Sequence, residues 1–335
     1  MRSRLFARPA AFSVLLLVCV LLTMQHVVSH DAGLRRNLTL TRLWKAIAVL
    51  SPPRAEELIG LQQRPPADLP ADDMNLLLTL DDRSVLPGAI LALLGQPLQA
   101  QRWLQSHAIA NGLDRYWLAL TAGQQNQAAA AIHLLTGVDG IDQYFAQAGL
   151  NAQGVGQFEQ ASRLLAAAAN LDNGHIEDHS LVYEYLAKNA YNQMHDWDAS
   201  FYWAERWIQA VPDNTYAYTW LAGLYLWRSQ PEQAYAALQR GQPYGIEQNP
   251  YYPGQIGEIY QTRGQWELAI EAYRRSWELQ KDVTWMRPYV AWDLGFALYH
   301  EGQWDEARPY LEIAAQEGIQ SAADTLAQME AGNSP

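Results

Sequence analysis

Apolar residues are distributed along this chain in three different ways. Between Pro9 and Val28 they dominate an uncharged run, and its centre, Ala10–Met24, is almost continuously aliphatic. Between Leu38 and Leu50 they recur at helical spacing, and from about residue 142 they recur in a longer repeat. These patterns predict, in chain order, a helix long enough to cross a membrane, a short amphipathic helix and a series of helical hairpins.

A short repeated phrase marks the longer repeat. Gly264–Ala269 and Gly302–Ala307 share a Gly-Gln-Trp start, an acidic residue and a final alanine, and weaker copies begin at Gly156, His195 and Ser229. The five starting residues are separated by 39, 34, 35 and 38 positions. A period near 34 residues is typical of stacked helix–turn–helix units, so the phrase predicts an all-α solenoid.

The repeats resemble the tetratricopeptide (TPR) family. In that family a small residue ends the first helix of each unit, an aromatic residue wedges the turn and a small residue opens the second helix, because the two helices approach closely. The unit that starts at Asn249 carries the pattern at Gly257, Gly264, Trp266 and Ala269. The last unit is also similar to the Sel-like repeat. The resemblance implies a right-handed superhelical solenoid that presents a long surface to a partner rather than one reaction centre.

The region between the apolar run and the repeats is predicted to be a connector. Residues 30–72 hold a juxtamembrane helix and a proline-rich linker, in which Pro65–Pro70 is a stiff spacer. Leu38–Leu50 either extends the membrane helix, lies on the membrane surface or packs on the first repeat. The resemblance then implies degenerate TPR-like hairpins at 73–141, TPR repeats over 142–321 (about 142–175, 181–214, 215–248, 250–283 and 288–321) and a capping helix and tail at 322–335.

The N-terminal run also predicts where the repeats are located. Three arginines form a basic tail over residues 1–9, and residues 10–29 are either a transmembrane signal anchor or a cleavable signal peptide. We favour the anchor, which places the basic tail in the cytoplasm and the repeats on the other side of a membrane. Cleavage near Val27–Ser29 would instead release a secreted protein.

Composition narrows the classes of partner. The 335 residues carry a net charge of −12 and show no basic face, so nucleic acid is not an expected partner. The one cysteine, Cys19, lies in the apolar run, so the repeats depend on helix packing rather than disulfides for stability. With 13 Trp and 18 Tyr against 6 Phe, the chain holds more amphipathic aromatic residues than the wedge and core positions require.

The sequence offers few candidates for catalytic or metal-binding residues. His175 and His179 are four residues apart and would share one face of a helix if that segment were helical, which makes them a weak candidate for a metal site. Asp172–Gly174, just before them, indicates a turn instead. The sequence has no glycine-rich phosphate-binding loop and no nucleophile elbow, so we expect neither an enzyme nor a cofactor.

The resemblance implies which side chains face a partner, because the first helix of each TPR unit lines a concave groove. TPR domains that grip acidic peptide tails carry lysines there, and this sequence has almost no basic residue at the matching positions. Its aromatic and amide side chains fit an extended peptide or helix, or a sugar stacked on flat rings, although such aromatics also pack between helices. The predicted groove residues are Tyr185, Asn189, Asn192, Gln193, Tyr216, Thr219, Trp227, Tyr251, Glu258, Gln261, Tyr289, Trp292, Phe296 and Tyr299.

Two functional hypotheses follow. The leading one is a non-enzymatic, membrane-anchored TPR scaffold outside the cytoplasm, which binds protein partners through its groove. The alternative is a glycan-binding module in the handling of cell-envelope polysaccharides. Both depend on the groove side chains, and only the location depends on the apolar run.

Overall fold

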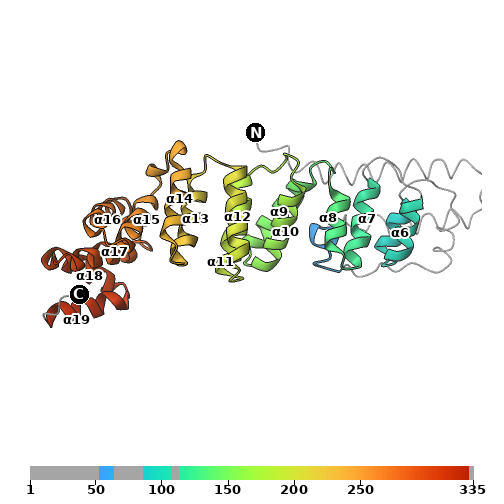
Figure 1. The fold of residues 1–335 in the computed structure, drawn as a ribbon. Coiled ribbons are helices and arrows are strands. Elements are labelled where there is room, and N and C mark those ends of the chain that lie inside the picture. Colours follow the sequence, from blue (N-terminus) through green and yellow to red (C-terminus); the bar gives the residue numbers. More distant parts are fainter. Residues whose placement is uncertain (1–52, 64–85, 107–112, 332–335) are drawn as a thin grey trace, which may run out of the picture. The chain divides into compact units, whose positions relative to one another are not determined.

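The computed structural model describes residues 53–63, 86–106 and 113–331, and within these ranges the chain is helical with no β-strand (Figure 1). This confirms the all-α class for the described part of the chain. The described residues form two compact units, which divide between Glu177 and Asp178.

The predicted membrane helix and the predicted juxtamembrane helix both lie outside the described residues. Among the helices that the structure does describe, none is both long enough and apolar enough to cross a membrane. The anchor, the signal peptide and the location of the repeats therefore stay predictions.

The N-terminal unit is built from pairs of neighbouring helices and one short helix, α3. The hydroxyls of Tyr116 and Tyr144 both donate to the carbonyl of Pro53, at 2.8 and 3.0 Å, and so attach the segment before α3 to two later helices. Leu58 of α3 is fully buried. The helices are α3 (Ala55–Leu58), α5 (Leu86–Leu93), α6 (Pro97–Ser106), α7 (Leu113–Gln124), α8 (Ala128–Leu135), α9 (Ile141–Gly154) and α10 (Phe158–Leu171).

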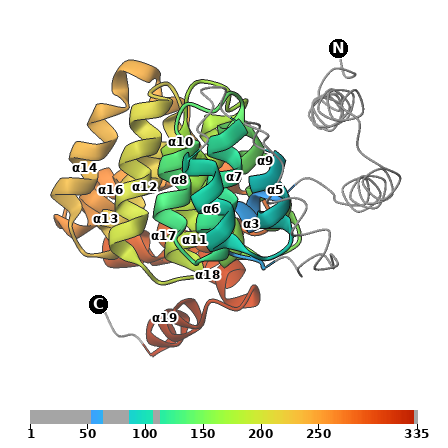
Figure 2. The same cartoon turned by 90° about the vertical axis from the view of Figure 1, so that its right-hand side faces the viewer.

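The C-terminal unit contains four hairpins and a final helix, with two short 3-10 turns before the third hairpin. Each hairpin has a first and a second helix that pack along one another (Figures 1 and 2). The helices are α11 (His179–Asn192), α12 (Trp197–Ala210), α13 (Thr215–Trp227), α14 (Pro231–Arg240), α15 (Tyr252–Thr262), α16 (Trp266–Gln280), α17 (Arg287–His300), α18 (Trp304–Gln316) and α19 (Gln320–Glu330).

Every repeated phrase begins with a residue in the left-handed backbone region. The φ angles of Gly156, His195, Ser229, Gly264 and Gly302 are 78°, 53°, 56°, 72° and 74°. A Cβ added to any of the three glycines would meet nothing within 4 Å. The glycine of the repeated phrase is therefore favoured by the left-handed backbone of the turn. It is not required by a close approach of the two helices, which corrects that part of the prediction.

The close approach occurs seven residues earlier, inside the first helix. A Cβ on Gly257 would lie 2.5 Å from the ring of Tyr273, and a Cβ on Gly149 would lie 2.7 Å from the side chain of Leu165. In both pairs the large residue follows the glycine by 16 positions and belongs to the second helix. The same spacing and contact recur at Gly88 with Leu104 and at Gly295 with Leu311.

Successive hairpins of the C-terminal unit are also joined by a repeated hydrogen bond. Asn214 precedes α13, and its side-chain nitrogen donates to the Ser180 hydroxyl at 2.6 Å. One repeat later, Asn249 donates to the Thr215 hydroxyl at 3.0 Å. The two asparagine oxygens accept from the backbone N–H of Tyr216 and Tyr251. Each asparagine therefore holds the start of one first helix and ties it to the first helix of the preceding hairpin.

The helix α19 closes the C-terminal end of the core. Ala322 and Met329 pack into the hydrophobic cluster formed by α16, α17 and α18. Asp324, Gln328 and Glu330 are exposed on its other side. This division of apolar and polar residues fits a helix that caps a repeat array and keeps its end soluble.

The glycines of α9 offer a matched test of the close approach. Gly149→Ala should lower the free energy of unfolding by about 2 kcal/mol, because the new methyl group overlaps Leu165 and the backbone of α10. Gly154→Ala, in the same helix, should raise it by about 0.5 kcal/mol, because nothing lies within 4 Å and alanine favours helix. Urea unfolding of both variants measures the difference. Equal effects would show that the contact with Leu165 does not restrict the size of the residue at position 149.

Candidate binding surface

The first helices of the C-terminal hairpins follow one another along one face. Between α11 and α13 the link is made by side chains, because Tyr191 stacks on Trp227 and Asn214 donates to Ser180. The helix α13 contacts α15, and α15 contacts α17, whereas the second helices α14 and α16 make at most slight contact with each other. Hairpins that meet through their first helices and diverge at their second helices curve, and the first helices then lie on the concave side. We call the face formed by α11, α13, α15 and α17 the inner face.

The predicted groove residues differ in exposure. They lie on the four helices that form the inner face, except Gln193, which follows α11, and Tyr251, which precedes α15. Whether these residues bind a partner stays a prediction. Asn192, Gln193, Tyr216, Trp227 and Tyr289 are exposed; Tyr185, Tyr251, Glu258, Gln261, Trp292 and Phe296 are partly buried; Asn189, Thr219 and Tyr299 are buried.

The three buried side chains do not belong to the accessible surface. Only 3 % of Asn189, 4 % of Thr219 and 2 % of Tyr299 is exposed. The Thr219 hydroxyl donates to the carbonyl of Tyr216 in its own helix at 3.1 Å, and Tyr299 belongs to the core of the last hairpins. Carrying positions over from a family misplaces such residues because one position along a helix turns the side chain by about 100°.

An aromatic cluster covers α11 and α13 at their C-terminal ends. The ring of Tyr191 stacks on Trp227 with 4.7 Å between centroids and 17° between planes. It also makes edge contacts with Trp197 at 4.8 Å and with Trp220 at 6.1 Å. Half of Trp227 remains exposed. The sequence identified Trp227 for this surface but not Tyr191 or Trp220, which face it only because neighbouring hairpins stack.

A second aromatic cluster covers the corresponding end of α17. The ring of His300 stacks on Trp266, with centroids 4.2 Å apart and planes within 4°. Phe296 contacts Trp292 at 4.9 Å and His300 at 4.8 Å. Trp266 is the aromatic residue of the repeated phrase and packs in the turn between α15 and α16. Its ring therefore extends the inner face at α17, in the next hairpin.

Two carboxyl groups, Glu258 on α15 and Asp293 on α17, lie on the inner face close enough to interact. Burial, and then the charge of Glu258, raises the pKa of Asp293 to about 7. Burial also raises the pKa of Glu258. On α16 behind them, burial and then the charges of Asp293 and Glu258 raise the pKa of the Tyr273 hydroxyl, which donates to Gln261 Oε1 at 2.9 Å. Within the described residues, neither carboxyl group has a hydrogen-bond or ion-pair partner to stabilise its charge.

On the outer side, an open cleft of about 660 Å³ lies along α12 beside the ends of α13 and α14. The ring of Phe201 contacts Tyr225 at 4.8 Å, and the exposed Tyr202 stands at the edge. Glu205 accepts two hydrogen bonds from Arg240, at 2.8 and 2.7 Å, so its charge is compensated. The lining residues are Asp198, Phe201, Tyr202, Glu205, Arg206, Gln209, Tyr225, Arg228 and Gln230.

The structure separates the two histidines of the weak metal candidate. His175 lies in the loop after α10, whereas His179 is the first residue of α11, so the shared helical face on which the weak candidate depended is not formed. The loop turns at Gly174, whose N–H donates to Asp172 Oδ1 at 3.0 Å. The preceding Asp-Asn-Gly sequence therefore had the stronger influence on the local structure.

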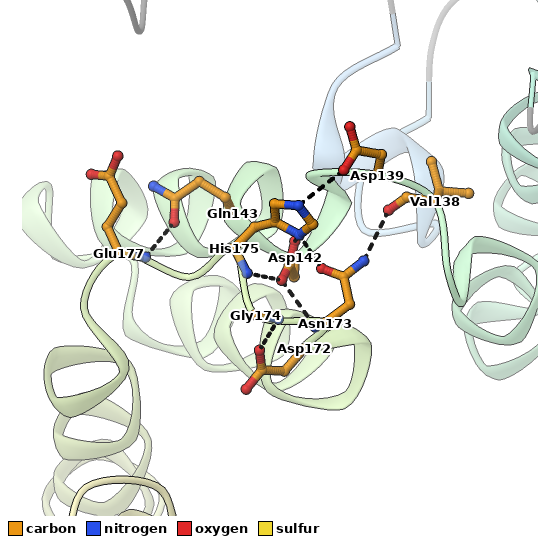
Figure 3. A network of polar contacts seen from close by, with 9 residues as sticks. All are labelled: Val138, Asp139, Asp142, Gln143, Asp172, Asn173, Gly174, His175 and Glu177. Carbon is orange, nitrogen blue, oxygen red and sulfur yellow. Dashed lines mark hydrogen bonds and ion pairs between the residues drawn. The ribbon is translucent and has the colours of Figure 1, made fainter.

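A carboxylate network explains the position of His175 (Figure 3). Asp142 of α9 is fully buried and accepts from the backbone N–H of Asn173 and of His175, both at 3.0 Å. The His175 ring places Nε2 2.9 Å from Asp139 Oδ1 and Nδ1 3.5 Å from Asp142 Oδ1. The network fastens the loop to α9, and within residues 53–63, 86–106 and 113–331 no group of three His, Cys, Asp or Glu side chains is arranged so that it could hold a metal ion.

Comparison with known proteins adds little to this description. No family model matches the sequence, and no curated protein is detectably similar to it. Among solved structures, MamA is 18 % identical over 55 % of this chain and 95 % of its own, with a TM-score of 0.42. The TPR domain of P58(IPK) is 15 % identical over 76 % of this chain and 75 % of its own, with a TM-score of 0.26. These likenesses do not bear on what the chain binds.

The raised pKa of Asp293 makes stability depend on pH. The folded chain holds the proton up to about pH 7, and an unfolded aspartate loses it near 3.8, so stability should fall as pH rises between these values. Asp293→Asn should therefore be more stable than the parent at pH 8, on the order of 2 kcal/mol, and equal to it near pH 4. Chemical unfolding at both pH values tests this, with Asp282→Asn in an exposed loop as the control. An advantage that is the same at both pH values would contradict the assignment.

The loop network gives a second stability test. Asp142→Ala should lower the free energy of unfolding by about 2 kcal/mol, because two backbone donors lose a buried charged acceptor. His175→Ala should cost less than about 1 kcal/mol, because the imidazole is largely exposed and surface ion pairs are weak. The reverse order in thermal unfolding would show that the imidazole, and not the carboxylate, holds the loop.

Proposed function

We propose that this protein is a non-enzymatic scaffold that binds a protein partner, as an extended peptide or a helix, along the inner face. The observation that carries the proposal is the set of exposed aromatic side chains on two of the first helices, α13 and α17. The exposed fractions are 48 % for Tyr216, 50 % for Trp227 and 55 % for Tyr289. Large aromatic residues that remain accessible on one continuous face are typical of interaction surfaces.

The chemistry of the inner face favours a peptide. Asn192 and Gln193 stand exposed at the end of α11, beside the cluster of Tyr191 and Trp227. Amide side chains donate to and accept from a peptide backbone, and the rings supply contact area at a low cost in side-chain entropy. Helical-repeat arrays use such elongated faces to bind segments of other proteins.

The proposal includes a location. The apolar run at residues 10–29, with its arginines before it, supports a single membrane anchor with a cytoplasmic N-terminus and extracytoplasmic repeats. A scaffold held in this way would gather its partners at the membrane surface. Cleavage of the run would give a secreted scaffold instead.

A glycan is the second candidate ligand, and the outer cleft favours it. Half of Tyr202 is exposed there, next to the polar side chains of Asp198, Gln209 and Arg228. A flat ring with donors and acceptors around it fits a sugar, which stacks its apolar face and hydrogen-bonds through its hydroxyls. The cleft is lined mainly by the second helix α12, and its exposed Tyr202 belongs to none of the inner-face helices, so variants can test the two candidates separately.

Variants on the two sides distinguish the candidates. Proteins crosslinked to the full chain in its native membrane should be captured at least tenfold less by Trp227→Ala with Tyr289→Ala, because both rings are accessible contact area. Tyr202→Ala, equally exposed on the outer cleft, is the matched control and should capture as much as the parent.

Two results would argue against the scaffold. The first is undiminished capture by the inner-face variant when its thermal unfolding matches that of the parent. The second is saturable binding of a glycan that Tyr202→Ala abolishes, together with no captured protein.

A further inference from the structure

We propose that Asn173 and Gly174 form a self-modification site, at which the side-chain amide of Asn173 is lost as ammonia and a carboxylate replaces it. The pair lies in the exposed loop after α10 (Figure 3). Asparagine is a thermolabile residue, and a following glycine favours the reaction because it has no side chain to hinder attack by its own backbone nitrogen. The proposal concerns this loop and does not depend on what the inner face binds.

The reaction is an acyl transfer within the chain. The backbone nitrogen of Gly174 loses its proton and attacks the Cγ atom of Asn173, which closes a succinimide ring. The bond from Cγ to the amide nitrogen breaks, and that nitrogen takes up a proton and leaves as ammonia. Water then opens the ring and gives aspartate or isoaspartate at position 173. The balance is water consumed and ammonia released, with no oxidant or reductant.

Asp172 is placed to take the proton from the attacking nitrogen. The backbone N–H of Gly174 donates to Asp172 Oδ1 at 3.0 Å. A carboxylate within hydrogen-bond distance of the proton that must leave has the geometry of a general base. Gly174 has a φ angle of 93°, which glycine adopts without strain, so the turn keeps this contact in place.

The imidazole of His175 lies against the group that leaves. Its Nδ1 atom contacts the amide end of the Asn173 side chain. When the amide is turned so that its nitrogen meets acceptors, that nitrogen lies 2.9 and 2.6 Å from the two carboxylate oxygens of Asp142 and beside the same Nδ1. The charged imidazole can then donate the Nδ1 proton to the departing nitrogen, while its Nε2 stays 2.9 Å from Asp139 Oδ1.

The surrounding bonds leave the attacking nitrogen to its base. Asp142 is fully buried and accepts from the backbone N–H of Asn173 and of His175, on either side of Gly174. It therefore positions the reacting pair without holding the nitrogen that attacks. The turn itself needs an acceptor at position 172, and a serine hydroxyl there would serve. A carboxylate at position 172 and an imidazole at position 175 exceed what the turn requires, which favours a chemical role for them.

The modification would loosen the loop from α9. A new carboxylate at position 173 joins a network that already holds Asp139 and Asp142, and like charges repel. Isoaspartate also lengthens the main chain by a methylene group, which displaces the N–H groups of residues 173 and 175 from Asp142 Oδ2. The same loop continues to Glu177, whose N–H donates to Gln143 Oε1 at 3.0 Å and which ends the N-terminal unit.

Peptide mapping by mass spectrometry of the full chain, aged in detergent at pH 7, tests the site. Conversion of Asn173 should be at least about tenfold faster in the folded chain than in the same chain unfolded in guanidinium chloride. Asp172→Ser keeps an acceptor for Gly174 but removes the carboxylate, so it should slow conversion about tenfold, and His175→Gln should slow it about threefold. Glu177→Gln removes an acid from the same loop and should leave the rate unchanged. Thermal unfolding verifies that each variant is folded.

Hydrogen exchange measures the consequence, because Asn173→Asp supplies one of the products by substitution. Exchange of the backbone of residues 172–178 should be at least about threefold faster in this variant and in the aged protein than in the fresh parent. Conversion in the folded chain that is no faster than in the unfolded chain would show that the turn protects Asn173, and the proposal would be wrong. An unchanged rate in folded Asp172→Ser would overturn the role of the carboxylate, and unchanged exchange would overturn the loosening of the loop.

Discussion

The architecture depends on one contact, which four of the hairpins share: a glycine of the first helix lies against a large side chain of the second helix 16 residues later. Gly149 with Leu165 and Gly257 with Tyr273 bring the two helices so close that a methyl group would overlap the partner. The left-handed turn between them, at Gly156 and at Gly264, sets the return path of the chain. Once this contact and this turn are repeated, hairpins of similar shape follow, and similar hairpins stack.

The same contact determines which side chains are left for binding. A first helix uses one side against its own second helix and another against the neighbouring hairpin, so a limited strip of its surface remains accessible. On α17 that strip carries Tyr289 and Asp293, whereas Tyr299 is turned into the core. Because the repeat constrains the packed sides and not the strip, aromatic and acidic residues can vary there without disturbing the fold.

No repeat pattern in the sequence indicates that two acidic residues from different hairpins interact in the folded chain. Glu258 and Asp293 are 35 residues apart and belong to different hairpins, yet the charge of Glu258 adds to burial in raising the pKa of Asp293. Tyr273, which makes the close contact with Gly257, places its hydroxyl near the same two groups. One residue thus connects the packing of the hairpin with the electrostatics of the inner face.

The sequence alone predicted an all-α chain and the positions of its hairpins. It did so through the repeat period, the repeated phrase and the small residues, because these signals are local and recur. The family resemblance also predicted that the first helices line a binding groove, and this stays a prediction. Tertiary structure alone decided that Asn189, Thr219 and Tyr299 are buried while Tyr216, Trp227 and Tyr289 are exposed, because helical phase depends on how neighbouring hairpins press together. It alone separated His175 from His179 and brought Asp293 to Glu258, because burial and proximity are properties of the packed chain and not of spacing along it.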